Sequence, residues 1–360
     1  MSKIAHQPGR IVRRDFLKAV AVGSCATLLA ACFEQPATKP VVSIVKIEGG
    51  DITAAVEEAI QLLGGIEKVA ANKQTIMLKP NLVNDSTSCT TNPDVVFALA
   101  SLMKAAGKEV LVGEASAGAN GYITGAACYV KDPVKLNDMQ QAVYDRLGYT
   151  ELADTMGVPL VNLHTGEMVD VDIPGGLAFQ KLTVHRSLTE IDMLCSVPMM
   201  KTHERASVSL GMKNLIGLYP GSIHGCIRSV IHNQAVAVGS EGVAFEIVDM
   251  VRANADKLGL VVIDGSTAME GNGPTAGLLV KMNVIIAGTN PLATDMVAAN
   301  VMGFEPDEVP HFVVAGSVGM EPTSLSEIEV RGESIASVRR DFRRPEMNPW
   351  IENSSYEECF

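Results

Sequence analysis

The sequence has few aromatic residues and lacks the short signatures of several common enzyme classes. Aromatic side chains make up 4% of the 360 residues, and there is one Trp. No G-x-G-x-x-G follows a predicted strand, and no Walker-type loop, H-E-x-x-H or G-x-S-x-G occurs. These absences argue against a dinucleotide dehydrogenase, a phosphate-loop ATPase, a zincin and a serine hydrolase.

The cysteines show no metal-binding spacing. None of the 7 Cys forms a Cys-x-x-Cys pair, so neither a zinc knuckle nor a ferredoxin-type cluster is encoded locally. We therefore expect no iron–sulfur cluster within the chain. Disulfide pairing is left open, with buried free thiols as the alternative.

The first 31 residues predict export. Arg13 and Arg14 precede a short apolar run that ends in Leu-Ala-Ala-Cys at Cys32, as in a bacterial lipobox. The run is shorter than the ~20 residues that a membrane-spanning helix needs. We expect a twin-arginine signal peptide over 1–31, read by the twin-arginine export machinery, and a tether over 32–40. The protein would be periplasmic or on the cell surface, lipid-anchored through Cys32; an ordinary signal with Cys32 unmodified is the alternative.

Charge is distributed unevenly along the chain. The chain has a net charge of −12, and without residues 1–31, which carry a net +4, the net charge is −16. This excess argues against nucleic acid and anionic lipid as the main partner. By contrast, residues 197–240 contain four basic residues and one carboxylate, Glu204. This segment predicts a site for a carboxylate or phosphate.

Apolar runs alternate with helical patterns, which predicts an α/β fold with a largely parallel sheet flanked by helices. The short apolar runs between 158 and 187 predict an inserted subdomain of short strands. A long loop is expected at 115–135. We expect one α/β domain over 41–331, followed by a C-terminal extension over 332–360. The predicted strands are 41–48, 74–81, 108–114, 191–201, 258–265 and 281–288, and the predicted helices are 51–63, 91–107, 136–148, 242–256 and 291–303.

Four predicted strands end in an ionisable residue followed by a loop. In open α/β sheets the ligand crevice lies outside the carboxyl ends of the strands, so such residues converge there. Any one of them alone is more usually a solvated lysine, a capping carboxylate or a structural histidine. Their coincidence predicts one polar cleft lined by Lys79, Asn81, Glu114, Lys201, His203 and Asp264.

Further candidates lie in three places. Lys213, Asn214 and His224 follow His203 within the basic segment, and imidazole can act as an acid–base group or a metal ligand. His232 could share a helix face with His224, although a surface pair explains that spacing equally well. The glycine-rich stretch 264–277 offers Glu270 and Asn272, with a plain turn as the alternative. Asp295 is a charge inside an apolar predicted helix, which suggests that it faces the same cleft.

The order of these motifs resembles the domain of unknown function 362 family. The matching blocks are "IMLKPNLV", "VPMMKTHERASVSLGMKNLIGL", "VVIDGSTAMEGNGPTAG" and "NPLATDMVAANVMG", within residues 42–319. Many relatives in that family carry or stand beside ferredoxin-type iron–sulfur modules, so the resemblance implies redox or cofactor chemistry. This chain departs from that arrangement because it lacks Cys-x-x-Cys. Any redox partner would therefore be a separate protein.

Three hypotheses of function follow. The first is an enzyme that binds an anionic small molecule through Lys79, Lys201 and Lys213, with His203 or His224 as acid–base group. Its carboxylate partners would be Asp264, Glu270 and Asp295, with a divalent metal left open. The second is an anion-binding protein without turnover, which becomes the better interpretation if those carboxylates lie away from Lys201. The third is an assembly factor for a cofactor-bearing partner.

Overall fold

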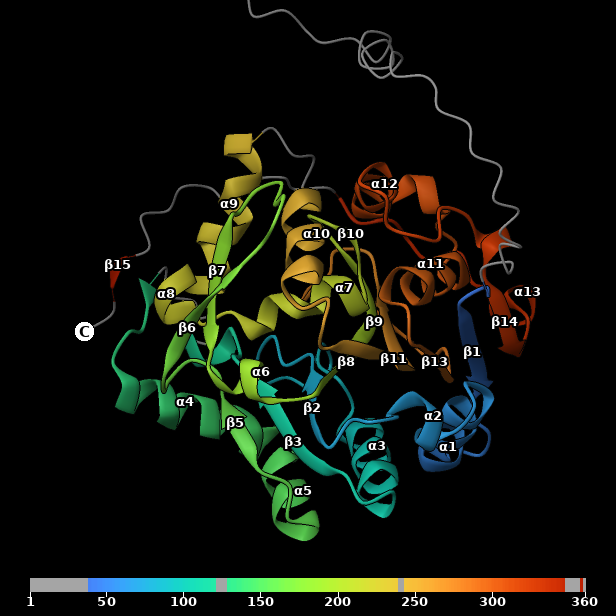
Figure 1. The fold of residues 1–360 in the computed structure, drawn as a ribbon, viewed down its shortest axis with the longest axis horizontal. Helices are drawn as coiled ribbons and strands as arrows, with labels where there is room; N and C mark the ends of the chain where they lie inside the picture. The colour runs from blue at the N-terminus through green and yellow to red at the C-terminus, as the bar shows by residue number, and fades with distance from the viewer. Residues whose placement is uncertain (1–37, 121–127, 239–242, 347–356, 359–360) are drawn as a thin grey trace, which may run out of the picture. The chain divides into compact units, whose positions relative to one another are not determined.

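The computed structural model describes residues 38–120, 128–238, 243–346 and 357–358 (Figure 1). The chain divides into two compact units, 1–38 and 39–360, and the fold described below is that of the second. Arg13, Arg14 and Cys32, which carry the predicted export signal and lipidation site, lie outside the described residues. Within the described ranges, no helix is long and apolar enough to cross a bilayer.

One large sheet forms the centre of this unit. Its main path runs in the order β14 (Glu329–Gly332), β1 (Val41–Lys46), β13 (Val284–Gly288), β11 (Leu258–Glu270), β8 (Met193–Val197), β2 (Thr75–Pro80), β3 (Glu109–Glu114) and β5 (Leu160–Asn162). Neighbouring strands on this path are parallel except where β13 pairs with β1 and β11. The predicted α/β fold with a largely parallel sheet is therefore confirmed.

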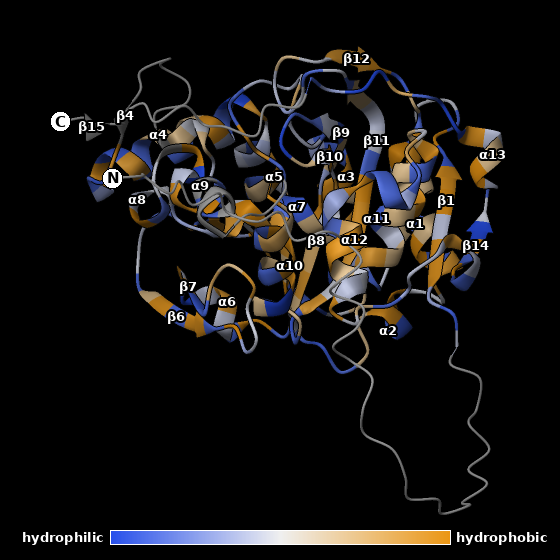
Figure 2. Cartoon of the chain, turned by 90° about the horizontal axis from the view of Figure 1, so that it is seen from above, coloured by the Kyte–Doolittle hydropathy of each residue, from blue (hydrophilic) through white to orange (hydrophobic). Residues whose placement is uncertain are grey.

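Helices cover both faces of the sheet and enclose two apolar cores (Figure 1). Because strand side chains alternate between faces, Met193 and Cys195 enter the first core and Leu194 enters the second. Figure 2 shows the apolar colouring of β1 and β8 between these helices. The first core packs against α1 (Ile52–Leu62), α3 (Pro93–Ala105), α4 (Pro133–Arg146) and α5 (Tyr149–Met156), and the second against α10 (Ala244–Ala253), α11 (Pro291–Val301) and α12 (Pro310–Ser317).

Side-chain caps fix where the main helices begin. Asp51 accepts a hydrogen bond from the Ala54 amide at 2.9 Å, which starts α1. Asn92 and Asn290 cap α3 and α11 in the same way, and each is followed by a proline at the first helical position. An acceptor side chain and a proline both suit the first turn, where backbone N–H groups lack helical partners.

The predicted subdomain of short strands is smaller than expected. The first of its three runs forms β5 and joins the main sheet beside β3. Only β6 (Met168–Asp172) and β7 (Lys181–His185) form a separate antiparallel hairpin. The single strand predicted over 191–201 is two strands, β8 and β9 (Met199–His203), because Pro198 between them has no N–H to donate to a ladder.

Several short elements complete the described chain. β10 (Ser207–Ser209) pairs with β9, and β12 (Leu278–Val280) pairs with β11. Phe342 is buried in the second core, so part of the predicted C-terminal extension packs on the domain. The remaining elements are α2 (Ile66–Val69), β4 (Cys128–Tyr129), α6 (Ser187–Glu190), α7 (Gly211–Asn214), α8 (Gly221–His224), α9 (Ser229–Val238), α13 (Ile335–Val338) and β15 (Glu357–Glu358).

Candidate functional site

A cavity of about 370 Å³ lies where β2, β3 and β9 end. Its walls also come from residues 209–217, residues 227–232 and the loop 272–276. The carboxyl ends of parallel strands are where ligands bind in open α/β sheets. The predicted site residues that line this cavity are Lys79, Asn81, Glu114, Lys201, His203, Lys213 and Asn272. We call this cavity the basic pocket.

The lining also includes Arg205, Arg228 and His232. From sequence, the two arginines were counted in the basic segment and His232 was considered beside His224, but none of the three was named as a site residue. All three are buried, and all three belong to the basic segment 197–240. The net positive charge of that segment was the signal that could have identified them. Together with Lys79, Lys201 and Lys213, the arginines give five cationic side chains in the lining, against the carboxylates Glu114 and Glu204.

Two of the predicted carboxylates lie outside the lining and hold backbone instead. Asp264 accepts hydrogen bonds from the Asn92 amide at 2.8 Å and from the amide and hydroxyl of Ser266 at 2.9 and 2.6 Å. Glu270 accepts from the Arg343 amide at 3.2 Å. Asp264 therefore joins β11 to the start of α3, and Glu270 joins β11 to the C-terminal segment.

The third predicted carboxylate, Asp295 on α11, also lies outside the lining, and it binds the start of α7. Its two oxygens accept hydrogen bonds from the Gly211 and Met212 amides at 2.8 and 2.7 Å. These amides open α7, the helical turn that carries Lys213. Burial raises the pKa of Asp295 to about 7, and the two amides oppose that shift. Asp295 is therefore a positioning residue for α7.

His224 and Asn214, which were also predicted as site residues, do not line the pocket. The His224 ring nitrogen Nε2 lies 3.0 Å from the Thr183 carbonyl on β7, and its ring packs edge-on against Tyr219. His224 thus faces the β6–β7 hairpin. Asn214 is buried beneath the pocket, where its amide nitrogen donates to the Lys79 carbonyl at 3.1 Å and to Ser196 Oγ at 3.0 Å.

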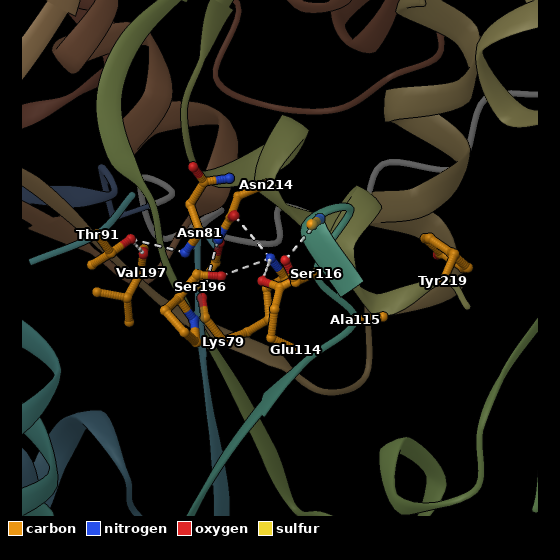
Figure 3. A network of polar contacts seen from close by, with 12 residues as sticks. Lys79, Asn81, Thr91, Glu114, Ala115, Ser116, Ser196, Val197, Asn214 and Tyr219 are labelled. Atoms are coloured by element: carbon orange, nitrogen blue, oxygen red, sulfur yellow. Dashed lines mark hydrogen bonds and ion pairs between the residues drawn. The ribbon is translucent and has the colours of Figure 1, made fainter. Parts of the chain in front are cut away.

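Lys79 is held by three acceptors in the network of Figure 3. Its Nζ donates to Glu114 Oε2 at 2.6 Å, to Asn214 Oδ1 at 2.9 Å and to the Pro80 carbonyl at 2.7 Å. An ammonium has three N–H groups, so this lysine has none left for a ligand. Burial lowers the pKa of Lys79 and raises the pKa of Glu114, while the attraction between the two opposes both shifts.

Gly217 allows this ion pair to sit under the pocket floor. A Cβ atom built on Gly217 would overlap Glu114 Oε1 and would lie 2.5 Å from Lys79 Nζ. The Gly217 carbonyl also accepts the Ala115 amide at 2.9 Å, next to Glu114. A larger residue here would displace the charged pair, so close backbone approach requires glycine.

Lys201 is also saturated with acceptors. Its Nζ donates to Asn81 Oδ1 at 2.6 Å, to the Cys89 carbonyl at 2.8 Å and to the Pro274 carbonyl at 3.3 Å. Burial lowers its pKa to about 8. Lys201 ties the end of β9 to the loops that follow β2 and β11, and it adds positive potential to the pocket.

Lys213 differs from the other two lysines. Among the described residues its Nζ has one hydrogen-bond partner, His232 Nε2, at 3.4 Å. Burial, with a smaller contribution from the neighbouring Arg205 and Lys201, lowers the pKa of Lys213 to about 7. Because His232 Nδ1 lies 3.1 Å from the Arg228 carbonyl, Nδ1 carries the proton and the Nε2 lone pair faces Lys213.

His203 presents a neutral imidazole to the pocket. Its Nδ1 accepts a hydrogen bond from the Arg205 amide at 3.1 Å, which leaves the ring proton on Nε2. Burial lowers the pKa of His203 well below its usual value, and nearby Lys213 and His232 act in the same direction. His203 therefore offers the pocket an N–H donor without a charge.

Hydrogen bonds of its side chain hold Arg228 in a strained backbone turn. Ile227 and Arg228 both have left-handed φ angles, of 45° and 57°, which are unfavourable for side chains of this size. The Arg228 guanidinium donates through Nε to the Tyr219 carbonyl at 2.8 Å and through Nη2 to the Ala115 carbonyl. These two bonds secure a strained turn whose residues line the pocket.

The donor set of the pocket does not fit a divalent metal. Glu114 Oε2 forms an ion pair with Lys79 Nζ, and Glu204 Oε1 lies 3.7 Å from Arg205 Nε. Within the described part of the chain, no group of three or more His, Cys, Asp or Glu side chains could hold an ion. The two lining histidines stand among five cations, which repel a second positive charge. The lining is therefore suited to an anion.

The family model described as "Domain of unknown function (DUF362)" matches residues 76–300, which include every polar lining residue named above. The "Thylakoid-associated protein sll1697" of Synechocystis sp. is 26% identical over 281 residues, which cover 77% of this chain and 78% of that protein.

Two solved structures are distant neighbours. The lactate racemase apoprotein from Thermoanaerobacterium thermosaccharolyticum gives a TM-score of 0.42 at 16% identity, covering 74% of this chain and 57% of that one. A structural-genomics target from Thermotoga maritima gives a TM-score of 0.40 at 13% identity, and the match covers 67% of this chain and 55% of that one. This chain therefore spans little more than half the length of either.

Proposed function

Because the chain belongs to the DUF362 family, a domain of unknown function, we propose its function from the basic pocket: it binds a small organic anion there. The observation that carries the proposal is Lys213, a buried cation whose hydrogen-bond partner is an imidazole rather than a carboxylate. A buried charge is unfavourable unless a group of opposite sign accompanies it. A bound carboxylate or phosphate would supply that group.

The positions of the predicted carboxylates favour binding over the enzyme as first formulated. Asp264, Glu270 and Asp295 hold backbone amides and do not line the pocket. They are therefore not available as acid–base partners for an anion beside Lys201. Any turnover would have to use Lys213, His203 and His232, which do line it.

Isothermal titration calorimetry with oxalate, phosphate and citrate tests the proposal. We expect at least one of these anions to bind, and Lys213→Met to weaken that binding by about thirtyfold or more, as expected when a buried charge loses its partner. Lys281→Met, at an exposed lysine outside the basic pocket, is the matched control and should bind as the wild type does. Equal affinity of Lys213→Met and the wild type would exclude this site.

We also propose that the protein is exported and anchored through Cys32, on the strength of Arg13, Arg14 and the Leu-Ala-Ala-Cys sequence alone. Mass spectrometry of protein purified from its own host should find Cys32 as a lipidated N-terminal residue. An N-terminus that precedes Cys32 would contradict the anchor.

A further inference from the structure

We propose that Lys213 forms an imine with the carbonyl carbon of a small 2-oxo acid bound in the basic pocket. The inference rests on the proposed anion site and goes beyond it, because it names the ligand as an anion that also carries a ketone or aldehyde. It also assigns a covalent step to a single lysine. The geometry around the pocket's three lysines, the imidazoles beside Lys213 and the surplus of cations support it.

Only one of the three lysines has the freedom that a nucleophile needs. The Nζ atoms of Lys79 and Lys201 each donate three hydrogen bonds to fixed oxygen acceptors. Losing a proton from either would remove a buried hydrogen bond. Among the residues that the structure describes, Lys213 Nζ instead has one hydrogen-bond partner, a nitrogen at 3.4 Å, and it lines the cavity. Its lone pair can therefore form without breaking a network.

A neutral imidazole beside this amine accepts its hydrogen bond and orients it. The hydrogen bond of His232 Nδ1 with the Arg228 carbonyl leaves the Nε2 lone pair directed at Lys213. The lowered pKa of Lys213, about 7, agrees with this arrangement, since burial and Arg205 both favour the neutral amine. Lysines surrounded by other cations in apolar pockets are the ones that proteins use as amine nucleophiles.

The step balances without an oxidant or reductant. The Lys213 ammonium releases a proton to solvent, and the freed Nζ lone pair forms a bond to the carbonyl carbon as the C=O π bond breaks. His203 Nε2–H is available to donate a hydrogen bond to the oxygen that becomes negative. A proton moves from Nζ to that oxygen, and a proton taken up from solvent then converts the hydroxyl into departing water. The products are an iminium and one water.

The remaining cations explain why the carbonyl compound should be an acid. Lys201, Arg205 and Arg228 line the same cavity and are buried, and they keep positive potential there when Lys213 is neutral. A carboxylate next to the carbonyl would be held by that potential while the carbonyl carbon meets Nζ. A neutral aldehyde would lack this attraction, so 2-oxo acids are the class of ligand that uses both parts of the site.

Borohydride trapping tests the inference on the full-length protein. The protein is incubated with pyruvate, glyoxylate or 2-oxoglutarate and sodium cyanoborohydride, digested and mapped by mass spectrometry. We expect one reduced adduct on Lys213, formed about a hundredfold faster than on an exposed lysine, because more of the amine is neutral at pH 7. Excess oxalate should slow the labelling of Lys213. Lys281, which is exposed, is the internal reference on the same protein.

Lys213→Arg separates the two proposals because it keeps the charge and removes the nucleophile. It should bind oxalate but form no adduct at position 213. Oxalate binding by the wild type without an adduct would overturn the imine and leave the anion site standing. Labelling of Lys213 no faster than that of Lys281 would also overturn it. Absence of both anion binding and labelling would overturn both proposals. The mapping on the wild type decides the question even if the variant fails to fold.

Discussion

Lys79 and Lys213 are both buried lysines of the same pocket, yet their surroundings are opposite. Lys79 lies near the end of the buried strand β2 and donates to a carboxylate, an amide oxygen and a carbonyl. Lys213 lies on the short helix α7, and in the described part of the chain its Nζ has one hydrogen-bond partner, an imidazole. Burial alone therefore does not distinguish a structural cation from a functional one. The set of partners does, and it predicts opposite effects for the same substitution at the two positions.

The largest effect should come from breaking the Lys79–Glu114 pair. Lys79→Met leaves Glu114 buried without its cation, since both side chains are almost fully inaccessible in the folded protein. Removing one member of a buried ion pair typically lowers the free energy of unfolding by about 3–5 kcal/mol. Chemical denaturation followed by circular dichroism would measure the loss.

The control for this prediction is the double variant Lys79→Met with Glu114→Gln. Because no charge is then left unpaired, it should recover part of the stability that Lys79→Met loses. If the double variant were as unstable as the sum of the two single variants, the ion pair would not be what holds this part of the pocket together.

At Lys213 the same substitution to Met should raise the free energy of unfolding, whereas at Lys79 it should lower it. Lys213→Met removes a buried cation that has no carboxylate partner in the described structure, so the free energy of unfolding should rise by about 0.5–2 kcal/mol. The unfolded chain keeps the lysine proton up to a pKa of ~10.4, whereas the folded chain releases it near 7. The gain should therefore be largest below pH 7 and should shrink as pH rises toward 10.

Denaturation curves of both proteins at several pH values, without anions that could occupy the pocket, would measure this difference. A loss of stability in Lys213→Met across the whole range would mean that Lys213 has a structural role like that of Lys79. The comparison between the two lysines would then fail.

Much of the fold could be predicted from the sequence because its signals are local. The apolar runs, Asp51 and Pro93 mark strands and helix starts within a few residues of themselves. The position of β5 could not be predicted this way, because pairing with β3 depends on a partner about fifty residues away. Pro198 was visible in the sequence, but an apolar run on both sides concealed that it divides one strand into two.

The pocket was predictable where a residue's direction follows from its strand. Lys79 and Lys201 end strands that share one edge of the sheet, so their convergence follows from topology. Asp264 was predicted to end a strand, but β11 continues to Glu270, and the Asp264 side chain accepts from the Asn92 amide, a contact set by the packing of α3. His232 could not be preferred over His224 from spacing, because the strained turn at Ile227 and Arg228 sets the direction of α9.

The smallest and most specific effect concerns pH. The pKa of Lys213 is lowered to about 7 by burial and by the charges that face it from the turn after β9, from β9 itself, from Arg228 before α9 and from β2. The titratable and charged groups around it are Arg205, Lys201, Arg228, Lys79, His203, His232, His311 and the buried carboxyl of Glu246. A bound anion favours the ammonium and so raises the pKa of Lys213 in the complex.

Affinity for oxalate should therefore be constant below pH 7 and fall above it, by up to about tenfold per pH unit, because binding must then take up a proton. Calorimetry in two buffers of different ionisation enthalpy would count that proton directly.

The control is Lys213→Arg, which should bind oxalate with little change in affinity between about pH 6 and about pH 7.5, since arginine stays charged there. Above that range the lowered pKa of Lys201, about 8, contributes its own decrease in affinity. An identical pH profile in the wild type and Lys213→Arg would assign the titration to Lys201. The distinction between the saturated lysines and the open one would then not extend to ligand binding.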